Sequence, residues 1–353
     1  MRADNGALMP LPVSDLAHVF AHTVSLWDDL RGCRIFLTGG TGFFGVWILE
    51  SFADAVDRLG LDSEIVVLSR DPAAFARKCP HLAGHRAIMV VAGDVCSFAF
   101  PSGEFLHVIH AATEASMILN PLVMLDTITN GTRRVLEFAA QCGCRRFLLA
   151  SSGGVYGRQP PELGHMPEDY RGAPELGKPA SAYGEGKRLA ELLCAITAQS
   201  AGFDAVSARG FAFVGPGLPL DRHFAVGNFL SDALHGGPIK IAGDGTPVRS
   251  YLYAADLAIW LWTLLLRGTP GAAYNVGSDE AVTIEVLAHK VARQFAPVPP
   301  VLIAKDAPRD GRLPERYVPS VEPARLELGL DVWITLDDAL RRTAAYEQEK
   351  RVL

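Results

Sequence analysis

The sequence has no excess of positive charge and no apolar run long enough to cross a membrane. Its 353 residues include 33 Lys and Arg against 39 Asp and Glu, a net charge of −6. Without a basic surface, nucleic acid is not expected as a partner. The longest apolar run, 257–266, is too short to span a bilayer and follows Asp256, so we predict a buried helix over 256–266 capped by Asp256. Residues 1–31 lack the features of a signal peptide, and no membrane association is predicted.

Cysteine pairs at metal-ligand spacing are missing as well. The six cysteines form no C-x-x-C pair, have no histidine at ligand spacing, and several lie in apolar runs. These features indicate reduced core thiols, no metal site and a reducing, cytoplasmic compartment. The sequence also has no internal repeat and no low-complexity tract, and its length suits one large α/β domain plus a smaller one.

The sequence does contain a strand, a glycine-rich turn and a helix in succession. The apolar run 35–37 is typical of a buried parallel strand, three glycines follow Thr38 at a spacing of three, and 46–56 has the composition of a helix. In such a unit the glycines permit a tight turn, a close approach of pyrophosphate and close helix packing, and the helix N-terminus faces the phosphates. We therefore expect NAD or NADP to contact Gly39, Thr41, Gly42, Phe43, Phe44 and Gly45.

Further buried strands are predicted at 64–69, 87–92, 106–110, 146–150 and 205–209, and residues at their carboxyl ends are expected at the cofactor. The second strand ends in Ser69 and Arg70. A basic residue there can bind the 2′-phosphate of NADP, which favours NADP over NAD, although Asp71 is also able to reach a ribose hydroxyl. Asp94 either accepts a hydrogen bond from the adenine amino group or belongs to a turn.

After the strand predicted at 106–110, the small side chains of Ala111, Ala112 and Thr113 let the backbone lie close to a flat cofactor. Within the helix predicted over 121–141, the pair Asn130–Gly131 works against helix propensity, as residues at functional sites often do. The remaining expected cofactor contacts are Val95, Ala111, Ala112, Thr113 and Asn130.

Three side chains are candidates for catalysis. Ser152 follows the fifth strand, and Tyr183 and Lys187 lie four residues apart in a predicted helix, which places them on one face. The lysine ammonium, together with a positive nicotinamide ring, can lower the pKa of the tyrosine phenol so that it takes a proton from a sugar hydroxyl. Ser152 is expected to hydrogen-bond the same sugar oxygen. Between these elements, the Pro- and Gly-rich stretch 158–180 is predicted to be a lid or substrate loop.

Six segments in this order resemble the extended short-chain dehydrogenases/reductases, specifically the nucleotide-sugar epimerase/dehydratase group. They are TGGTGFFG at 38–45, GDV at 93–95, HAA at 110–112, NGTRRVLE at 130–137, SSGGVYG at 151–157 and YGEGK at 183–187. The resemblance implies that Tyr183 is the acid/base, that Lys187 binds the ribose and lowers the tyrosine pKa, and that Ser152 polarises the reacting oxygen. It also implies cofactor regeneration in each turnover and a homodimer.

The sequence lacks carboxylates that two classes of enzyme in that group carry. Its dehydratases place an Asp and a Glu directly after the serine position and its decarboxylases keep the Glu, whereas this sequence has Gly153 and Gly154 there. A 4,6-dehydratase is therefore disfavoured. The group's asparagine before Gly-Pro is also replaced by a phenylalanine-rich segment, 211–214.

Substrate contacts are expected from the second half of the chain as well as from Ser152 and Gly153. By resemblance, Arg249 is a ligand of a sugar-nucleotide diphosphate, a task that suits arginine's bidentate hydrogen bonds. Asn228 either binds the same group or caps a helix. Arg312 is a further candidate for a phosphate or nucleobase contact.

The predicted fold is a doubly wound, Rossmann-like parallel sheet with a smaller C-terminal α/β part. Residues 1–31 are expected to add a helix capped by Ser14 or Asp15, laid on the nucleotide-binding domain or across a subunit contact. Residues 32–210, with parts of 211–280, form the dinucleotide-binding domain, and 211–353 mainly bind substrate. The predicted function is a nucleotide-sugar epimerase, the alternative is an NADPH-dependent 4-keto-sugar reductase, and a non-catalytic NAD(P)-binding sensor is the third hypothesis.

Overall fold

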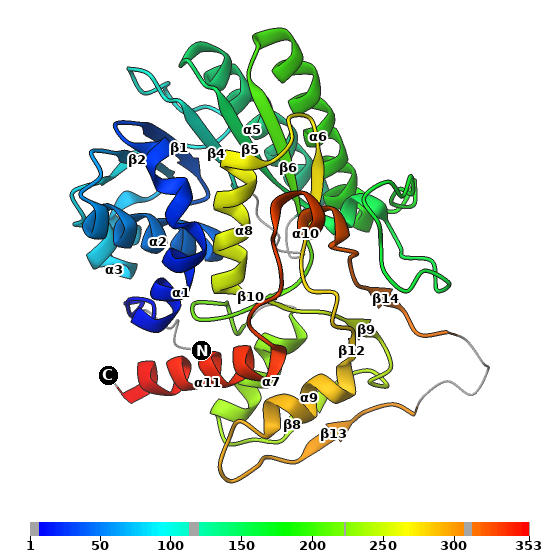
Figure 1. Ribbon diagram of the computed structural model, residues 1–353. Coiled ribbons are helices and arrows are strands. Elements are labelled where there is room, and N and C mark those ends of the chain that lie inside the picture. The colour runs from blue at the N-terminus through cyan, green and yellow to red at the C-terminus, as the bar shows by residue number, and fades with distance from the viewer. Residues whose placement is uncertain (1–6, 113–119, 222–223, 307–312, 353) are drawn as a thin grey trace.

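The structure of the protein is a computed structural model, in which residues 7–112, 120–221, 224–306 and 313–352 are described. Its centre is a sheet of seven strands in the order β11-β6-β5-β4-β1-β2-β3, and every neighbouring pair is parallel (Figure 1). The strands are β1 (Arg34–Thr38), β2 (Glu64–Ser69), β3 (Ile88–Ala92), β4 (His107–His110), β5 (Arg146–Ser152), β6 (Asp204–Gly210) and β11 (Ala273–Val276). The strand order reverses between β1 and β4, which is where doubly wound sheets bind ligands. The predicted fold class is confirmed.

Helices cover both faces of this sheet because successive side chains of each strand point to opposite faces. Ile35 and Leu37 pack in the core beneath α1 (Val13–Thr23), α2 (Phe43–Leu59) and α8 (Ala254–Arg267). Phe36, between them in the sequence, packs in the core beneath α5 (Pro121–Gln141) and α6 (Ala182–Ala201). The near-continuous apolar strands predicted for a buried parallel sheet follow from this double coverage.

The N-terminal segment differs from its prediction at the cap. One helix was expected to begin at Ser14 or Asp15, but α1 begins at Val13 after Pro12 and gives way to the 3-10 helix η1 (Val24–Leu30). Asp15 is fully buried, where it accepts hydrogen bonds from the Tyr253 hydroxyl at 2.5 Å and from Arg342 at 2.5 Å. The carboxylate thus joins α1 to the second half of the chain, and α1 packs on α2 and α8.

Asp256 does not cap α8, contrary to the prediction. The helix begins two residues earlier, at Ala254, and Asp256 is buried within its first turn. Its carboxylate accepts from the backbone N–H of Ile334 at 2.9 Å and bonds Nε2 of His18 at 2.8 Å. As predicted, α8 is a buried helix, and no helix in the described ranges is long and apolar enough to span a membrane.

After β6 the chain contributes α8 and β11 to the main sheet layer, and its other elements form small sheets and helices, most of which lie below the main sheet in Figure 1. Its strands pair as β10-β7, β12-β9-β14 and β13-β8. The strands are β7 (Phe213–Val214), β8 (Ile239–Ile241), β9 (Val248–Arg249), β10 (Leu252–Tyr253), β12 (Val282–Thr283), β13 (Val301–Ile303) and β14 (Arg316–Tyr317), and the helices are α7 (Ala225–Leu234), α9 (Ile284–Ala292), α10 (Glu322–Leu328) and α11 (Leu336–Val352).

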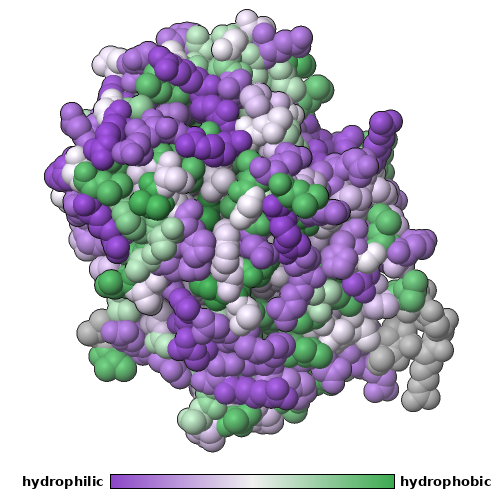
Figure 2. Space-filling view, in the orientation of Figure 1, coloured by the Kyte–Doolittle hydropathy of each residue, from purple (hydrophilic) through white to green (hydrophobic). Residues whose placement is uncertain are grey.

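The remaining elements are short and connect the larger ones. They are α3 (Pro72–Lys78), α4 (Pro80–Ala83) and the 3-10 helices η2 (Gly153–Tyr156) and η3 (Pro179–Ser181). All six cysteines are free thiols, and five of them are buried. On the face shown in Figure 2, hydrophilic residues dominate and hydrophobic ones are scattered among them.

Candidate active site

The turn between β1 and α2 needs glycine at two positions for internal reasons. Gly39 has a φ of +76°, and a Cβ on it would lie 2.5 Å from the carbonyl group of Ala111. A Cβ on Gly45 would lie 2.3 Å from Cα of Gly40. These two glycines therefore let the turn form and let α2 pack against it.

Gly42 is different, because the protein's own packing does not require a glycine there. Its φ is −88°, and the nearest atom to a Cβ on it would be the Gly39 carbonyl oxygen at 3.4 Å. Gly42 is also the N-cap of α2 and supplies no side-chain hydrogen bond to the first N–H groups of the helix. An open glycine at an uncapped helix N-terminus fits a dinucleotide diphosphate, which needs both close backbone approach and N–H donors.

The residues around the turn are arranged as follows. The Thr41 carbonyl accepts from the Lys78 ammonium at 3.2 Å, and the Phe44 ring packs edge-on against Phe213, with 5.0 Å between ring centroids. Phe43 packs against Phe44. This side of the turn is thus an aromatic wall built by α2 and β7.

The end of β2 presents a hydroxyl and a guanidinium. Ser69 is buried and its Oγ accepts from the Asp71 backbone N–H at 3.2 Å, while Arg70 is exposed. Asp71 caps α3 by accepting from the Ala74 N–H at 2.8 Å. The Asp71 carboxylate was a candidate ribose ligand, but in this structure it caps a helix.

Asp94 and Asn130 occupy exposed positions on neighbouring elements. One Asp94 oxygen accepts from the Cys96 N–H at 2.9 Å, which forms a turn. Gly131 packs on Val95, where a Cβ would come within 3.0 Å of a valine methyl group. Close packing thus accounts for the glycine that interrupts the helical sequence of α5.

The end of β4 is held by a buried hydrogen-bonded chain. His110 bonds Thr38 Oγ1 at 2.7 Å and Thr132 Oγ1 at 3.1 Å, and Thr38 Oγ1 accepts from the Ala112 N–H at 3.2 Å. Burial, and then the nearby Lys187 charge, lower the pKa of His110 to about 3, so the ring is neutral. The chain fixes the Ala111–Ala112 backbone against Gly39. Thr113 lies outside the described residues.

Ser152, Tyr183 and Lys187 gather at the end of β5. Ser152 is the N-cap of η2, where its Oγ accepts from the Gly154 N–H at 3.0 Å. Its Oγ and the Tyr183 ring lie on the same side of Gly154, since a Cβ there would be 3.3 Å from the former and 3.5 Å from the latter. Tyr183 lies in the first turn of α6 and Lys187 one turn later. The Lys187 ammonium is buried and donates to the Ala150 carbonyl at 2.6 Å.

The electrostatics of this group differ from the expectation. Burial raises the pKa of Tyr183, and the neighbouring Ser152 hydroxyl opposes this rise only in part. Lys187 was expected to lower that pKa, but its own pKa is lowered to about 8 by burial, against the opposing effects of Glu191 and Cys194, and its ammonium is directed to a backbone carbonyl. The protein alone therefore keeps Tyr183 protonated at neutral pH.

Two glycines that sequence reasoning passed over bring Tyr183 into place. A Cβ on Gly184 would lie 2.5 Å from the Gly154 carbonyl oxygen, and one on Gly186 would lie 3.0 Å from Ile128 on α5. Both glycines let α6 approach its neighbours. Two glycines in one helical turn oppose helix propensity, and that signal was present in the sequence.

A second group of residues missed by the sequence reasoning lines the site beside Gly153. A Cβ on Gly153 would lie 2.7 Å from the Tyr317 hydroxyl and 2.7 Å from Cζ of Phe211. The rings of Phe211 and Tyr317 pack together at 4.5 Å between centroids. Phe211, from the phenylalanine-rich segment 211–214, and Tyr317 thus form a wall beside Gly153.

Of the other candidate substrate ligands, Arg249 comes near this wall, because it pairs with Tyr317 in the β9-β14 register. Its guanidinium donates to the Glu315 carboxylate at 2.7 Å. Asn228 lies on the exposed side of α7 and does not cap it, since the N-cap is Phe224. Arg312 lies outside the described residues. No cluster of three or more potential metal ligands occurs in the part of the chain that the structure describes.

A doubly wound sheet with this glycine turn, and with serine, tyrosine and lysine at the end of β5 and the start of α6, defines the extended short-chain dehydrogenases/reductases. The model of the NAD dependent epimerase/dehydratase family matches residues 35–277. The chain belongs to this family, which confirms the resemblance drawn from its motifs, and it is an enzyme of the NAD(P)-dependent type.

Relatives and solved structures with several activities are similar to this chain. UDP-glucuronic acid decarboxylase 1 of Danio rerio is 30% identical over 315 residues, which cover 89% of this chain and 72% of the decarboxylase. The UDP-N-acetylglucosamine 4-epimerase of Methanobrevibacter ruminantium, in complex with UDP-N-acetylmuramic acid, has a TM-score of 0.78 at 19% identity and covers 91% of this chain and 99% of its own. The dTDP-glucose 4,6-dehydratase of Bacillus anthracis, in complex with NAD, has a TM-score of 0.72 at 18% identity and covers 90% and 97%. The two structures share the fold.

Proposed function

We propose that the protein is a nucleotide-sugar epimerase that oxidises one sugar carbon, lets the keto sugar turn, and reduces it from the other face. The observation that carries this proposal is that Ser152 and Tyr183 meet beside Gly154, where a Cβ would lie 3.3 Å from the serine Oγ and 3.5 Å from the tyrosine ring, with glycine at both positions after the serine. This arrangement supplies proton transfer at one oxygen and no carboxylate for any further step.

The candidate roles follow from the contacts. Tyr183 takes the proton of the reacting sugar hydroxyl and returns it, while Ser152 donates a hydrogen bond to the same oxygen. Lys187 is proposed to hold the cofactor ribose. A nicotinamide cofactor, when bound, would supply the acceptor and donor of the hydride at the sugar carbon, and its positive ring would favour the Tyr183 phenolate that burial disfavours.

Elimination and decarboxylation are disfavoured at Gly153 and Gly154. Family dehydratases carry an Asp and a Glu at these positions, and decarboxylases keep the Glu. In this chain the space beside Gly153 is filled by Tyr317 and Phe211. The 30% identity to a UDP-glucuronic acid decarboxylase therefore supports a UDP-linked sugar as the substrate class without supporting its reaction.

Substrate binding is proposed to fall mainly to the residues after 211. Arg249 is the candidate diphosphate ligand, because it lies beside Tyr317 at the same wall. To bind there, a diphosphate has to replace the Glu315 carboxylate as the partner of the Arg249 guanidinium. Asn228 and Arg312 remain candidates for further contacts.

The second candidate function is an NADPH-dependent nucleotide-4-keto-sugar reductase. The observation that favours it is the exposed Arg70 at the end of β2, where a basic side chain can accept the 2′-phosphate of NADP. Engagement of Asp71 in the α3 cap points the same way.

One assay separates these functions. The purified protein is incubated with UDP-glucose, UDP-glucuronic acid and UDP-N-acetylglucosamine without added cofactor, while NMR follows sugar configuration and absorbance follows reduced nicotinamide. Epimer formation without net reduced cofactor is the expected result. A strict requirement for stoichiometric NADPH with a 4-keto sugar would support the reductase, and cofactor binding without turnover of any sugar would support a sensor.

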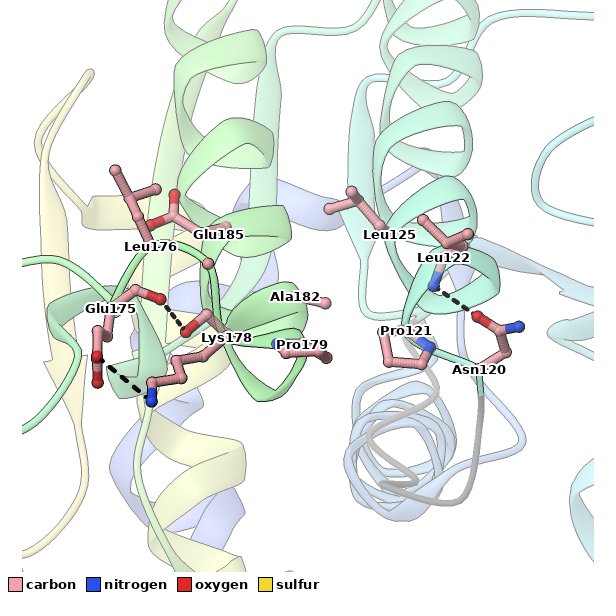
Figure 3. Close-up of a pocket in the computed structure, with 12 residues that line it drawn as sticks. Asn120, Pro121, Leu122, Leu125, Glu175, Leu176, Lys178, Pro179, Ala182 and Glu185 are labelled. Atoms are coloured by element: carbon pink, nitrogen blue, oxygen red, sulfur yellow. Dashed lines mark hydrogen bonds and ion pairs between the residues drawn. The ribbon is translucent and has the colours of Figure 1, made fainter.

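We also propose a homodimer formed through α5 and α6. Exposed apolar side chains lie on these helices, with Leu122 70%, Leu192 55% and Ile196 57% exposed. A pocket of about 500 Å³ lies between the start of α5 and residues 175–185. Figure 3 shows Leu125 of α5 pointing toward the segment that contains Leu176 and Ala182. Such a face is apolar enough to bury against a second copy. Light scattering is expected to report a dimer, and a monomer for L192E/I196E.

A further inference from the structure

Lys78 is a positively charged residue beside the nucleotide turn that was not singled out from the sequence. It lies in the last turn of α3, and its Nζ donates to the Thr41 carbonyl at 3.2 Å. Thr41 directly precedes Gly42, the N-cap of α2, where a dinucleotide diphosphate fits. A lysine from another helix thus reaches the edge of the proposed cofactor site.

The backbone of Lys78 is held on both sides. Phe75, one turn earlier in α3, is buried in the core, and its carbonyl accepts from the Cys79 N–H at 2.8 Å. The Lys78 carbonyl accepts from the Leu8 N–H at 2.6 Å, and Leu8 belongs to the segment before the residues that the family model matches. The position of this ammonium therefore depends on contacts outside the motifs of the nucleotide turn.

The adenosine ribose of a dinucleotide is expected between Lys78 and the end of β2. Thr38 of β1 pairs with Leu68 of β2, so the turn after β1 and the residues after β2 leave the same edge of the sheet. In doubly wound folds the diphosphate lies at that turn and the ribose at the end of the second strand. Arg70 follows that strand, and α3, about 10 Å long, connects it to Lys78. Two cations thus flank the ribose position.

We propose that Lys78 binds the 2′-phosphate of NADP together with Arg70, and so selects NADP over NAD. The two cofactors differ only in this phosphate, and a phosphate monoester carries a charge of about −1.5 to −2 at pH 7. An ammonium has three N–H donors, of which the Thr41 carbonyl takes one, and the others can be directed to phosphate oxygens. The inference rests on the proposed function only for the presence of a nicotinamide cofactor.

The test compares NAD⁺ and NADP⁺ binding by calorimetric titration and needs no turnover. We expect the native protein to bind NADP⁺ at least about 10-fold more tightly than NAD⁺, and Lys78→Met to weaken NADP⁺ binding by about 10- to 100-fold, because a charged hydrogen bond is lost. NAD⁺ binding to this variant is expected to be unchanged, which also shows that the nucleotide turn keeps its shape. Lys78→Arg, which keeps the positive charge, is expected to retain most of the preference.

The matched control is the neighbouring cation of α3. Arg77 is exposed like Lys78, but successive side chains of a helix point about 100° apart, so Arg77 is directed elsewhere. Arg77→Met is expected to leave both dissociation constants unchanged. An equal loss of NADP⁺ preference in Arg77→Met and Lys78→Met would overturn the inference, because it would show an effect of overall charge.

Two further results would overturn the inference. One is a native protein that binds NAD⁺ as tightly as NADP⁺. The other is equal weakening of both dinucleotides in Lys78→Met, because the lysine would then act on the diphosphate that they share.

Turnover separates this inference from the proposed function. If Lys78→Met lost the preference for NADP⁺ while Tyr183→Phe retained full turnover, the proposed function would fail and the assignment of Lys78 would stand. If Tyr183→Phe lost turnover and Lys78→Met kept the preference for NADP⁺, the assignment would fail and the proposed function would stand.

Discussion

Replacing three glycines by alanine, one at a time, separates the glycine that the fold needs from the one that a cofactor needs. Gly60 has a φ of +58° with no atom within 4 Å of a Cβ. The loss of unfolding free energy in Gly60→Ala therefore measures only the cost of placing alanine in a left-handed backbone conformation, about 1–2 kcal/mol. Gly39→Ala has the same penalty plus a contact at 2.5 Å with the Ala111 backbone, which cannot move aside as a side chain can. Its loss of unfolding free energy is expected to exceed that of Gly60→Ala by about 1–3 kcal/mol.

Gly42→Ala is expected to change stability little. Its φ of −88° suits alanine and no contact is closer than 3.4 Å, so a weaker N-cap and a less flexible unfolded chain nearly offset each other. The methyl group instead fills the space that a diphosphate is expected to occupy. Loss of one hydrogen bond to a charged phosphate, about 1.5–3 kcal/mol, corresponds to a weakening of NAD⁺ binding by about 10- to 100-fold.

The assay combines urea unfolding with calorimetric titration of NAD⁺ and NADP⁺. We expect Gly42→Ala to unfold within about 0.5 kcal/mol of the native protein and to bind both dinucleotides weakly. Gly60→Ala serves as the control that is less stable and binds normally. If Gly42→Ala bound either dinucleotide as tightly as the unmodified chain, the assignment of the α2 N-terminus to the diphosphate would be refuted.

Three other substitutions test different parts of the account. Tyr183→Phe should lose about 10²- to 10⁴-fold in turnover while its calorimetric NAD⁺ affinity stays unchanged, and a variant with normal turnover would exclude Tyr183 as the acid/base. Arg70→Ala should weaken NADP⁺ and leave NAD⁺ binding unaltered, whereas equal effects on both would contradict a 2′-phosphate contact. Burial lowers the pKa of His110 to about 3, below its ordinary value of 6.5. As the pH falls below 6.5, the imidazole therefore takes up a proton in the unfolded chain but not in the folded chain. The folded protein loses stability as the pH falls from 6.5 toward 3 for this reason. His110→Gln should consequently lose about 2 kcal/mol less unfolding free energy between pH 7 and pH 5 in urea titrations, and an equal loss would show that His110 is charged when folded.

Local patterns were sufficient for the sheet and the nucleotide turn. The helix predicted over 121–141 has the bounds of α5, and the strand ends fall within two residues of their predictions, because buried parallel strands are nearly continuous apolar runs. The spacing of Gly39, Gly42 and Gly45 also predicted the strand, turn and helix in order.

Contacts between distant segments could not be predicted in this way. Asp15 and Asp256 each precede apolar helical sequence, as a capping residue does, yet both are buried and bind residues far away in the sequence. Asp15 binds Tyr253 and Arg342. Asp256 binds His18 and Ile334. Tyr317 was overlooked for the same reason, since nothing in the sequence around it indicates that β14 lies against the end of β5.

The pKa of Tyr183 illustrates a third limit. A lysine four residues later in a helix predicts a neighbouring positive charge, but the direction of the ammonium depends on tertiary contacts. Lys187 is turned to the Ala150 carbonyl, which the spacing alone did not reveal.

The most direct test of the proposed hydride transfer follows a deuterium label at the sugar carbon that is inverted. The UDP-sugar that the protein turns over is prepared with deuterium at that carbon and incubated with the protein and unlabelled NAD⁺, and mass spectrometry follows the label in both epimers, in free cofactor and in water. The account predicts that the deuterium stays at the same carbon of the product, with none in water and none in the free cofactor. Deuterium released to water would mean that the carbon loses a proton and no hydride, and the proposed mechanism would be wrong.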